Sequence, residues 1–110
     1  MIELDEKYVF HIPLFRYADG KLIEIEIDDL IEDLMIQFSQ IGHDNLYVTK
    51  VNGYYKSRRY DELLITLFVC KSTHNPEEIF QNWFKKHNDV LQQEAFAYEC
   101  GNKMYIEKIM

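Results

Sequence analysis

Residues 63–70, which read LLITLFVC, form a run that is hydrophobic on both sides of an extended chain. Successive side chains of a strand point to opposite faces. One face would therefore carry Leu63, Ile65, Leu67 and Val69, and the other would carry Leu64, Thr66, Phe68 and Cys70. A strand with one wet face alternates apolar with polar residues instead. The run therefore predicts a strand of a sheet that is covered on both faces.

Two segments have the pattern of amphipathic helices. Between residues 28 and 41 the apolar residues recur at helical spacing, and Asp28 or Asp29 can cap the start, which predicts a helix of about 13 residues. The second helix begins with an Asn-Pro-Glu-Glu sequence and runs over about 76–91. Proline suits the first helical position, where its missing N–H has no partner to lose, and the glutamates meet the positive end of the helix dipole.

Alternating and apolar runs predict strands at Lys7–Phe15, Leu46–Tyr55, Glu62–Cys70, Glu94–Cys100 and Lys103–Ile109. Residues 22–27 fit either a short return strand or an extended lead-in to the first helix, and the pattern does not separate the two. Asn52-Gly53 indicates a bulge or a bend. Gly101-Asn102 is typical of a two-residue hairpin turn, which places Tyr98 opposite Tyr105.

This order of elements resembles the ferredoxin-like fold. Strand–helix–strand occurs twice, with an antiparallel hairpin in the middle. The resemblance covers most of the chain and implies an α+β two-layer sandwich, with a mainly antiparallel sheet of about four to six strands and two helices on one face. A length of 110 residues suits a single domain, residues 1–110. The acylphosphatases share this topology, but their glycine-rich phosphate loop has no counterpart after the first predicted strand, so their activity is not implied.

The face of the sheet away from the helices is the predicted contact surface. Two helices cover only one face, and the other face would carry Val9, His11, Phe15, Leu64 and Phe68. An apolar patch of this kind usually meets a partner. A second copy packed sheet against sheet, as in the dimeric α+β barrels, predicts a homodimer. Strands or the N-terminal segment folded over this face within one chain, or a different partner, are the alternatives.

The segment 54–60 is the predicted binding loop. The chain has a net charge of −7, whereas residues 50–60 carry four positive charges and no acid. Its aromatic and basic side chains suit an acidic or anionic ligand; they are Tyr54, Tyr55, Lys56, Arg58, Arg59 and Tyr60. The alternative is a solvated hairpin tip whose arginines are neutralised by Asp61 and Glu62. The acidic remainder disfavours direct binding of nucleic acid.

The histidines are weaker candidates. His87 is the polar member of an apolar helix face, and it is either a pocket residue or a core histidine bonded to a carbonyl or a tyrosine. His11 lies on the apolar sheet face and is either an interface residue or a group in a cavity. His43 and His74 lie in predicted turns and are expected to be solvated. No carboxylate partner of His11 is identifiable from the sequence, so the case for acid–base catalysis is weak.

The sequence contains no nucleophile motif, phosphate loop, dinucleotide fingerprint or zinc-type spacing, so no catalytic residue, cofactor or metal site is predicted. The first interpretation is therefore a non-catalytic protein-interaction or ligand-binding module. The alternatives are a small cofactor-free enzyme with a pocket around His11 or His87, and an acidic inhibitor or decoy of a nucleic-acid-binding protein. The acidic start and the absence of a long apolar run predict a cytoplasmic protein without a membrane span. Cys70 and Cys100 are expected to be free, half-buried strand residues.

Overall fold

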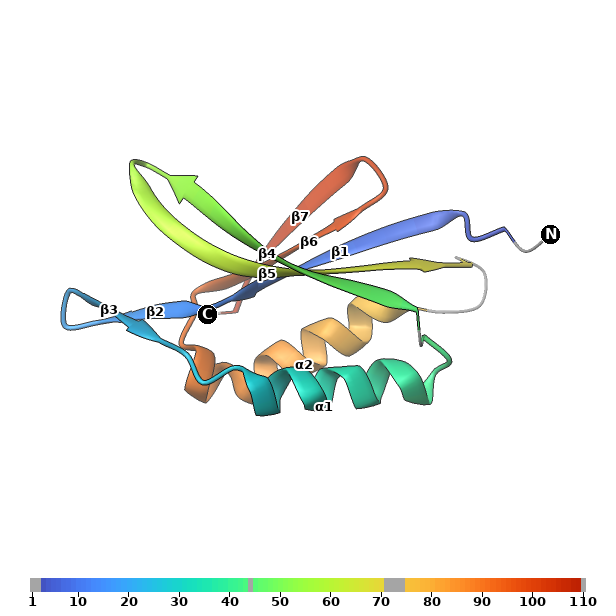
Figure 1. The fold of residues 1–110 in the computed structure, drawn as a ribbon, viewed down its shortest axis with the longest axis horizontal. Helices are drawn as coiled ribbons and strands as arrows, with labels where there is room; N and C mark the ends of the chain where they lie inside the picture. The colour runs from blue at the N-terminus through green and yellow to red at the C-terminus, as the bar shows by residue number, and fades with distance from the viewer. Residues whose placement is uncertain (1–2, 44, 71–74, 110) are drawn as a thin grey trace.

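The computed structural model describes residues 3–43, 45–70 and 75–109. Two helices lie side by side under one face of a twisted antiparallel sheet, which confirms the predicted α+β two-layer sandwich (Figure 1). The elements are β1 (Glu6–Pro13), β2 (Phe15–Ala18), β3 (Lys21–Glu24), α1 (Asp28–Gln40), β4 (Leu46–Tyr55), β5 (Arg58–Val69), α2 (Pro76–Leu91), β6 (Ala95–Cys100) and β7 (Lys103–Lys108).

The main sheet has the strand order β4-β5-β1-β6-β7, and every neighbouring pair in it is antiparallel. β1, the first strand of the chain, therefore lies in the middle of the sheet, between β5 and β6. β2 and β3 form a separate two-stranded hairpin that extends beyond the end of the main sheet (Figure 1). In the described parts of the chain, neither helix has the length and apolar character needed to cross a membrane.

Both helices occupy the predicted segments, but their starts are not capped as expected. The residue before α1 is Ile27, and no side chain makes a capping hydrogen bond there; Asp28 and Asp29 lie inside the first turn. Their carboxylates still face the positive end of the helix dipole, so they favour the helix by charge rather than as caps. Pro76 holds the first position of α2 as predicted, and the Asn75 side chain makes no capping bond.

The predicted strand Lys7–Phe15 is divided into two. β1 stops at Pro13, which has no N–H to donate to a ladder, and the chain then turns away to form β2. Residues 21–24 are the return strand of a hairpin with β2, so the first of the two alternatives for this region is correct. Phe15 therefore belongs to the small sheet and lies apart from Val9 and His11 of β1, which corrects its place in the predicted contact surface.

The expected bulge at Asn52-Gly53 is wrong. β4 pairs with β5 without interruption, and Gly53 lies opposite Tyr60. The backbone explains the glycine, since an added Cβ would lie 2.8 Å from the carbonyl oxygen of Tyr60. At the other hairpin the prediction is confirmed, because Tyr98 pairs with Tyr105 and their rings stack with centroids 5.2 Å apart.

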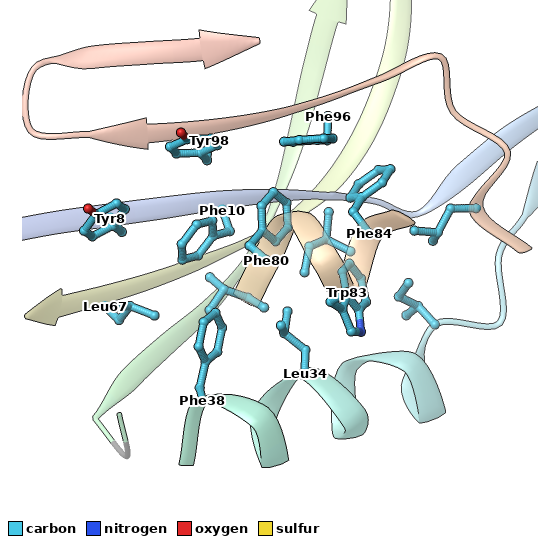
Figure 2. Packing of buried hydrophobic residues seen from close by; sticks show 14 of the residues in the cluster. Tyr8, Phe10, Leu34, Phe38, Leu67, Phe80, Trp83, Phe84, Phe96 and Tyr98 are labelled. Carbon is cyan, nitrogen blue, oxygen red and sulfur yellow. The ribbon is translucent and has the colours of Figure 1, made fainter. Parts of the chain in front are cut away.

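The core lies between the sheet and the two helices and is mainly aromatic (Figure 2). Phe80 of α2 points into its centre and contacts Phe10 of β1, with ring centroids 4.6 Å apart. Trp83, one turn further along α2, is fully buried and donates its indole N–H to the carbonyl oxygen of Leu30 at 2.8 Å. This hydrogen bond ties α2 to α1 and satisfies the one polar group that the indole takes into the core.

Candidate functional site

A large hollow of about 820 Å³ opens between β2, the outer end of the β4–β5 hairpin and the segment that follows α2. Its aromatic wall contains Tyr17, Tyr54 and Tyr60. Charged side chains of both signs complete the lining, among them Arg58 and Glu62. This volume lies within the range of about 300–1,000 Å³ that is usual for small-molecule pockets. The hollow therefore has the size and the mixed lining of a ligand site.

Contacts among the lining side chains build the wall. The guanidinium of Arg58 lies over the ring of Tyr17, 5.3 Å from its centroid, and the edge of Tyr17 meets Tyr60 at 6.1 Å. These contacts join the β2–β3 hairpin to β5. A cation over an aromatic ring is worth about 0.5–1 kcal/mol at an exposed site, so this contact is a weak one.

Gln93 fixes the opposite side of the large hollow. α2 ends at Leu91, and the next residue, Gln92, has the left-handed conformation with φ of 50°, which turns the chain out of the helix. The amide of Gln93 then donates to the carbonyl oxygen of Phe15 at 3.2 Å and to that of Leu91 at 2.8 Å. The side chain of Arg16 donates to the amide oxygen of Gln92. Polar contacts thus hold β2 against the end of α2.

Part of the predicted binding loop lines this hollow. Tyr54, Arg58 and Tyr60 belong to its wall, whereas Lys56 lies exposed at the hairpin turn, away from it. The side chain of Tyr55 lies outside the described part of the structure. No ligand contact tests these residues, so their role in binding stays a prediction.

Arg59 differs from its neighbour Arg58. Its Nε donates to Asp61 at 2.8 Å and its terminal nitrogen donates to Asn52 at 3.0 Å, and Arg59 is not among the residues that line the hollow. The hydrogen bond and charge of Asp61 raise the pKa of this exposed arginine. The alternative in which nearby acids neutralise the loop therefore describes Arg59, while Arg58 keeps its contact with the aromatic wall.

A smaller hollow of about 200 Å³ adjoins the large one on the other side of Glu62. Both hollows are lined by Glu62 and Gln93, and the smaller one also contains His11 and Ile106. Glu62 is opposite Pro13 in the register of β1 and β5. Its carboxylate therefore lies where the aromatic wall meets the face of the sheet that the helices leave uncovered.

His11 contacts two carboxylates on this face. Its Nε2 lies 2.7 Å from Glu99 of β6, and its Nδ1 lies 3.5 Å from Glu62 of β5. Burial on its own lowers the pKa of this histidine, but the two carboxylates more than offset that effect and raise the pKa above its ordinary value. Sequence reasoning missed both partners, because each lies on a strand far from β1 in the chain.

The remaining residues of the predicted contact surface do share this face. Val9 and His11 are two residues apart in β1 and therefore point to the same face, opposite Thr66 and Leu64 of β5. Phe68 of β5 is exposed on this face, and further exposed apolar side chains extend the surface onto the outer strands β4 and β7; they are Tyr47, Met104 and Ile106. Self-association through this surface stays a prediction.

His87 lies away from both hollows, between the two helices. Its Nε2 donates to Asp33 of α1 at 2.7 Å, rather than to a carbonyl or a tyrosine as expected. This bond, together with weaker contributions from Gln37 and Lys86, lowers the pKa of Asp33 against a smaller opposing effect of burial. His87 therefore joins the helices, and the alternative of a pocket around it is not supported by its position.

His43 is buried, which corrects the expectation of a solvated turn residue. Its ring meets Phe38 edge-on with centroids 6.4 Å apart, and its backbone N–H donates to the carbonyl oxygen of Phe38 at 2.9 Å. His74 lies outside the described residues. Cys100 is a half-buried strand residue whose thiol donates to Glu6 at 3.0 Å, and Cys70 lies just beyond the end of β5. Within the described ranges, no group of three His, Cys, Asp or Glu side chains is arranged to hold a metal ion.

Comparison with known proteins gives a match at the level of structure. A solved structure of a phage SAM lyase in its apo state is similar to this chain, with a TM-score of 0.65 and 14% sequence identity, over 98% of this chain and 94% of the other. A phage SAM lyase in complex with S-methyl-5'-thioadenosine is similar with a TM-score of 0.62 and 14% identity, over 94% of this chain and 88% of the other. No model of a known protein family and no curated protein sequence matches the chain.

These similarities correct the first functional interpretation. At 14% identity they establish the shared fold. Both solved structures are of an enzyme, so the interpretation as a non-catalytic interaction or binding module is contradicted. Sequence patterns do not single out Arg16, Tyr17 and Gln93, which line the hollows, or Glu99, which contacts His11. None of them lies in a motif, and only the paired strands and the turn after α2 bring them together.

Proposed function

We propose that this chain is an enzyme that binds S-adenosylmethionine, or SAM, and cleaves it to release S-methyl-5'-thioadenosine. The observation that carries the proposal is the lining of the large hollow, found in a chain whose fold is that of SAM lyase structures. The hollow combines aromatic rings, arginines and carboxylates, and SAM contains a group suited to each of them.

The aromatic wall suits the adenine ring. Tyr54 and Tyr60 offer flat faces at the mouth of the hollow, and stacking of a base on an aromatic side chain is worth about 1–3 kcal/mol. Tyr17 is already covered by Arg58. An adenine ring that stacks on Tyr17 would replace the contact with the Arg58 guanidinium by a larger stacking contact.

The charged groups suit the rest of the molecule. The sulfonium and the ammonium of SAM are cations, and Asp61, Glu62 and Glu94 supply carboxylates around the hollow. The methionine carboxylate is an anion, which Arg16 or Arg58 can bind with a two-pronged guanidinium contact. The anionic group expected at this segment would then be the carboxylate of the amino-acid part of SAM.

The proposed reaction breaks the bond between the sulfonium sulfur and the γ-carbon of the aminobutyrate part of SAM. The bonding electrons go to sulfur, which becomes the neutral thioether of S-methyl-5'-thioadenosine. The four-carbon fragment either closes onto its own carboxylate to form a lactone or transfers a proton from its β-carbon to a carboxylate of the hollow or to water and forms a double bond. Either route consumes SAM alone, so no cofactor is needed.

The experiment is incubation of the purified chain with SAM, followed by chromatographic measurement of S-methyl-5'-thioadenosine. We expect the thioadenosine to accumulate above the slow breakdown of SAM alone, and to bind the protein in calorimetry. Replacing Arg58 by alanine should weaken binding about tenfold, the equivalent of about 1.4 kcal/mol. Lys56→Ala is the matched control, because it removes the same charge from the same hairpin outside the hollow. Absence of both product and saturable binding would refute the proposal.

A further inference from the structure

The contact of His11 with two carboxylates determines its protonation. Each ring nitrogen faces a glutamate oxygen, Nε2 toward Glu99 at 2.7 Å and Nδ1 toward Glu62 at 3.5 Å. A neutral imidazole has one N–H and one lone pair, so it can donate to only one of them and turns its lone pair toward the other. The imidazolium has two N–H groups and attracts both. The geometry therefore favours the charged ring.

Among the described residues, the charged groups in contact with His11 are both carboxylates. β1 lies between β5 and β6, and the groups that face His11 from these strands are Glu62 and Glu99. Lys7 shares the face but lies four residues along β1, opposite Phe68. The His11 side chain is 14% exposed, so water competes little with its two contacts.

Glu62 is the partner that connects this contact to the ligand site. It lines both hollows, and its side chain is 30% exposed, so it can reach a ligand in either one. A glutamate free to rotate would lose conformational entropy when it binds a ligand. A carboxylate already held from behind by His11 loses less, and it keeps its place relative to the tyrosines of the large hollow.

We propose that charged His11 is a positioning residue, which holds the Glu62 carboxylate at the junction of the two hollows and makes turnover fall as the pH rises and the ring loses its proton. The proposal rests on the proposed function, since turnover means cleavage of SAM. The raised pKa of His11 agrees with it. His11 touches no substrate in this role; it acts through Glu62.

The first measurement is an NMR titration of the His11 ring, which needs no activity. We expect its titration midpoint to lie above about 6.5, the ordinary value for histidine. The midpoint should move down in Glu62→Gln and again in Glu99→Gln, because each substitution removes one attracting charge. A midpoint at or below the ordinary value, or one that neither substitution changes, overturns the charged contact and the proposal with it.

The second measurement is the rate of thioadenosine release from about pH 6 to about pH 9, which spans the expected titration of the ring. His11→Gln should lower kcat by up to about 100-fold, which a misplacement of about 1 Å in the site can cause, and should remove the pH dependence. His11→Lys keeps a positive donor up to about pH 10 and should restore part of the rate while moving the fall in rate to higher pH. A residue needed only for folding would show no such move.

His87→Gln is the matched control. His87 is similarly enclosed, with its side chain 17% exposed, and it also lies 2.7 Å from a carboxylate, but it joins the helices outside both hollows. Its variant should keep the wild-type pH profile. Wild-type kinetics in His11→Gln overturn the positioning role alone. Wild-type protein that forms no thioadenosine removes the function and this role together, while a high titration midpoint would still establish the charged contact.

Discussion

Replacing Phe80 by alanine should remove a large part of the stability of this fold. Phe80 is fully buried, and its ring is the centre of an aromatic cluster on α2 and the sheet (Figure 2). The partner rings have centroids between 4.6 and 6.4 Å away; they are Phe10, Trp83, Phe84, Phe96 and Tyr98. Truncation of a buried phenylalanine costs about 3–5 kcal/mol. Because rings pack against Phe80 from both the helix and the sheet, we expect the upper half of that range.

That loss is large beside the whole free energy of unfolding, about 5–15 kcal/mol for a small domain. The assay is urea unfolding followed by the fluorescence of Trp83, the single tryptophan of the chain, whose ring stacks on Phe80 with centroids 6.0 Å apart. With a slope of about 2 kcal/mol per molar urea, the midpoint should fall by about 2 M. Circular dichroism provides a second signal, since the substitution also changes the surroundings of the indole.

Two further variants separate the causes. Phe80→Leu keeps most of the volume and removes the ring stacking, so it should cost about 1–2 kcal/mol. Val90→Ala lies on the same helix but is 40% exposed, and it should change stability by no more than about 0.5 kcal/mol. A loss below about 2 kcal/mol for Phe80→Ala, with an unchanged urea slope, would refute the reasoning that this cluster organises the core.

Three other predictions concern other parts of the molecule. The pKa of Asp33 is lowered in the folded protein, so its contact with His87 stabilises the fold at pH values above the unfolded-state pKa of 3.8. This stability is lost as the pH falls through the lower folded-state pKa. The melting temperature of Asp33→Asn should therefore fall less than that of the wild type over this pH interval. Gly53→Ala should lower the melting temperature, because the new Cβ would lie 2.8 Å from the carbonyl oxygen of Tyr60, and an unchanged melting temperature would contradict this close approach. The predicted homodimer should appear in light scattering as twice 13.3 kDa and dissociate in Ile106→Lys; a wild-type monomer at micromolar concentration would refute it.

The parts of the fold that could be predicted are those with local causes. α1 and α2 follow from helical spacing and from the residues at their starts, and the β6–β7 hairpin follows from its two-residue turn. The small β2–β3 sheet could be predicted only in part from the sequence. A proline at residue 13 indicates that pairing stops, but it does not tell where the chain goes next.

The candidate site depends on contacts that no local pattern contains. His11 stands out in the sequence as a polar residue on an apolar face, yet its partners lie on β5 and β6, and Glu99 is 88 residues away in the sequence. His87 likewise meets Asp33 across 54 residues. Side-chain periodicity assigns a residue to a face, but the strand order decides which residues of two strands become neighbours. The segment 54–60 stands out because its composition is itself local, but the structure places a turn only at residues 56–57, between the ends of β4 and β5, and its role in binding stays a prediction.

The walls of the large hollow come from near the beginning, the middle and near the end of the chain, at residues 13–17, 53–62 and 92–95. A molecule seated there would bridge three stretches that meet only after the entire sheet has assembled. A ligand bound in the hollow would therefore stabilise the folded state and raise the melting temperature by mass action. A chain truncated at either end would lose part of the lining and with it the binding of the ligand. Thermal stabilisation by the ligand therefore offers a simple check that a preparation is intact.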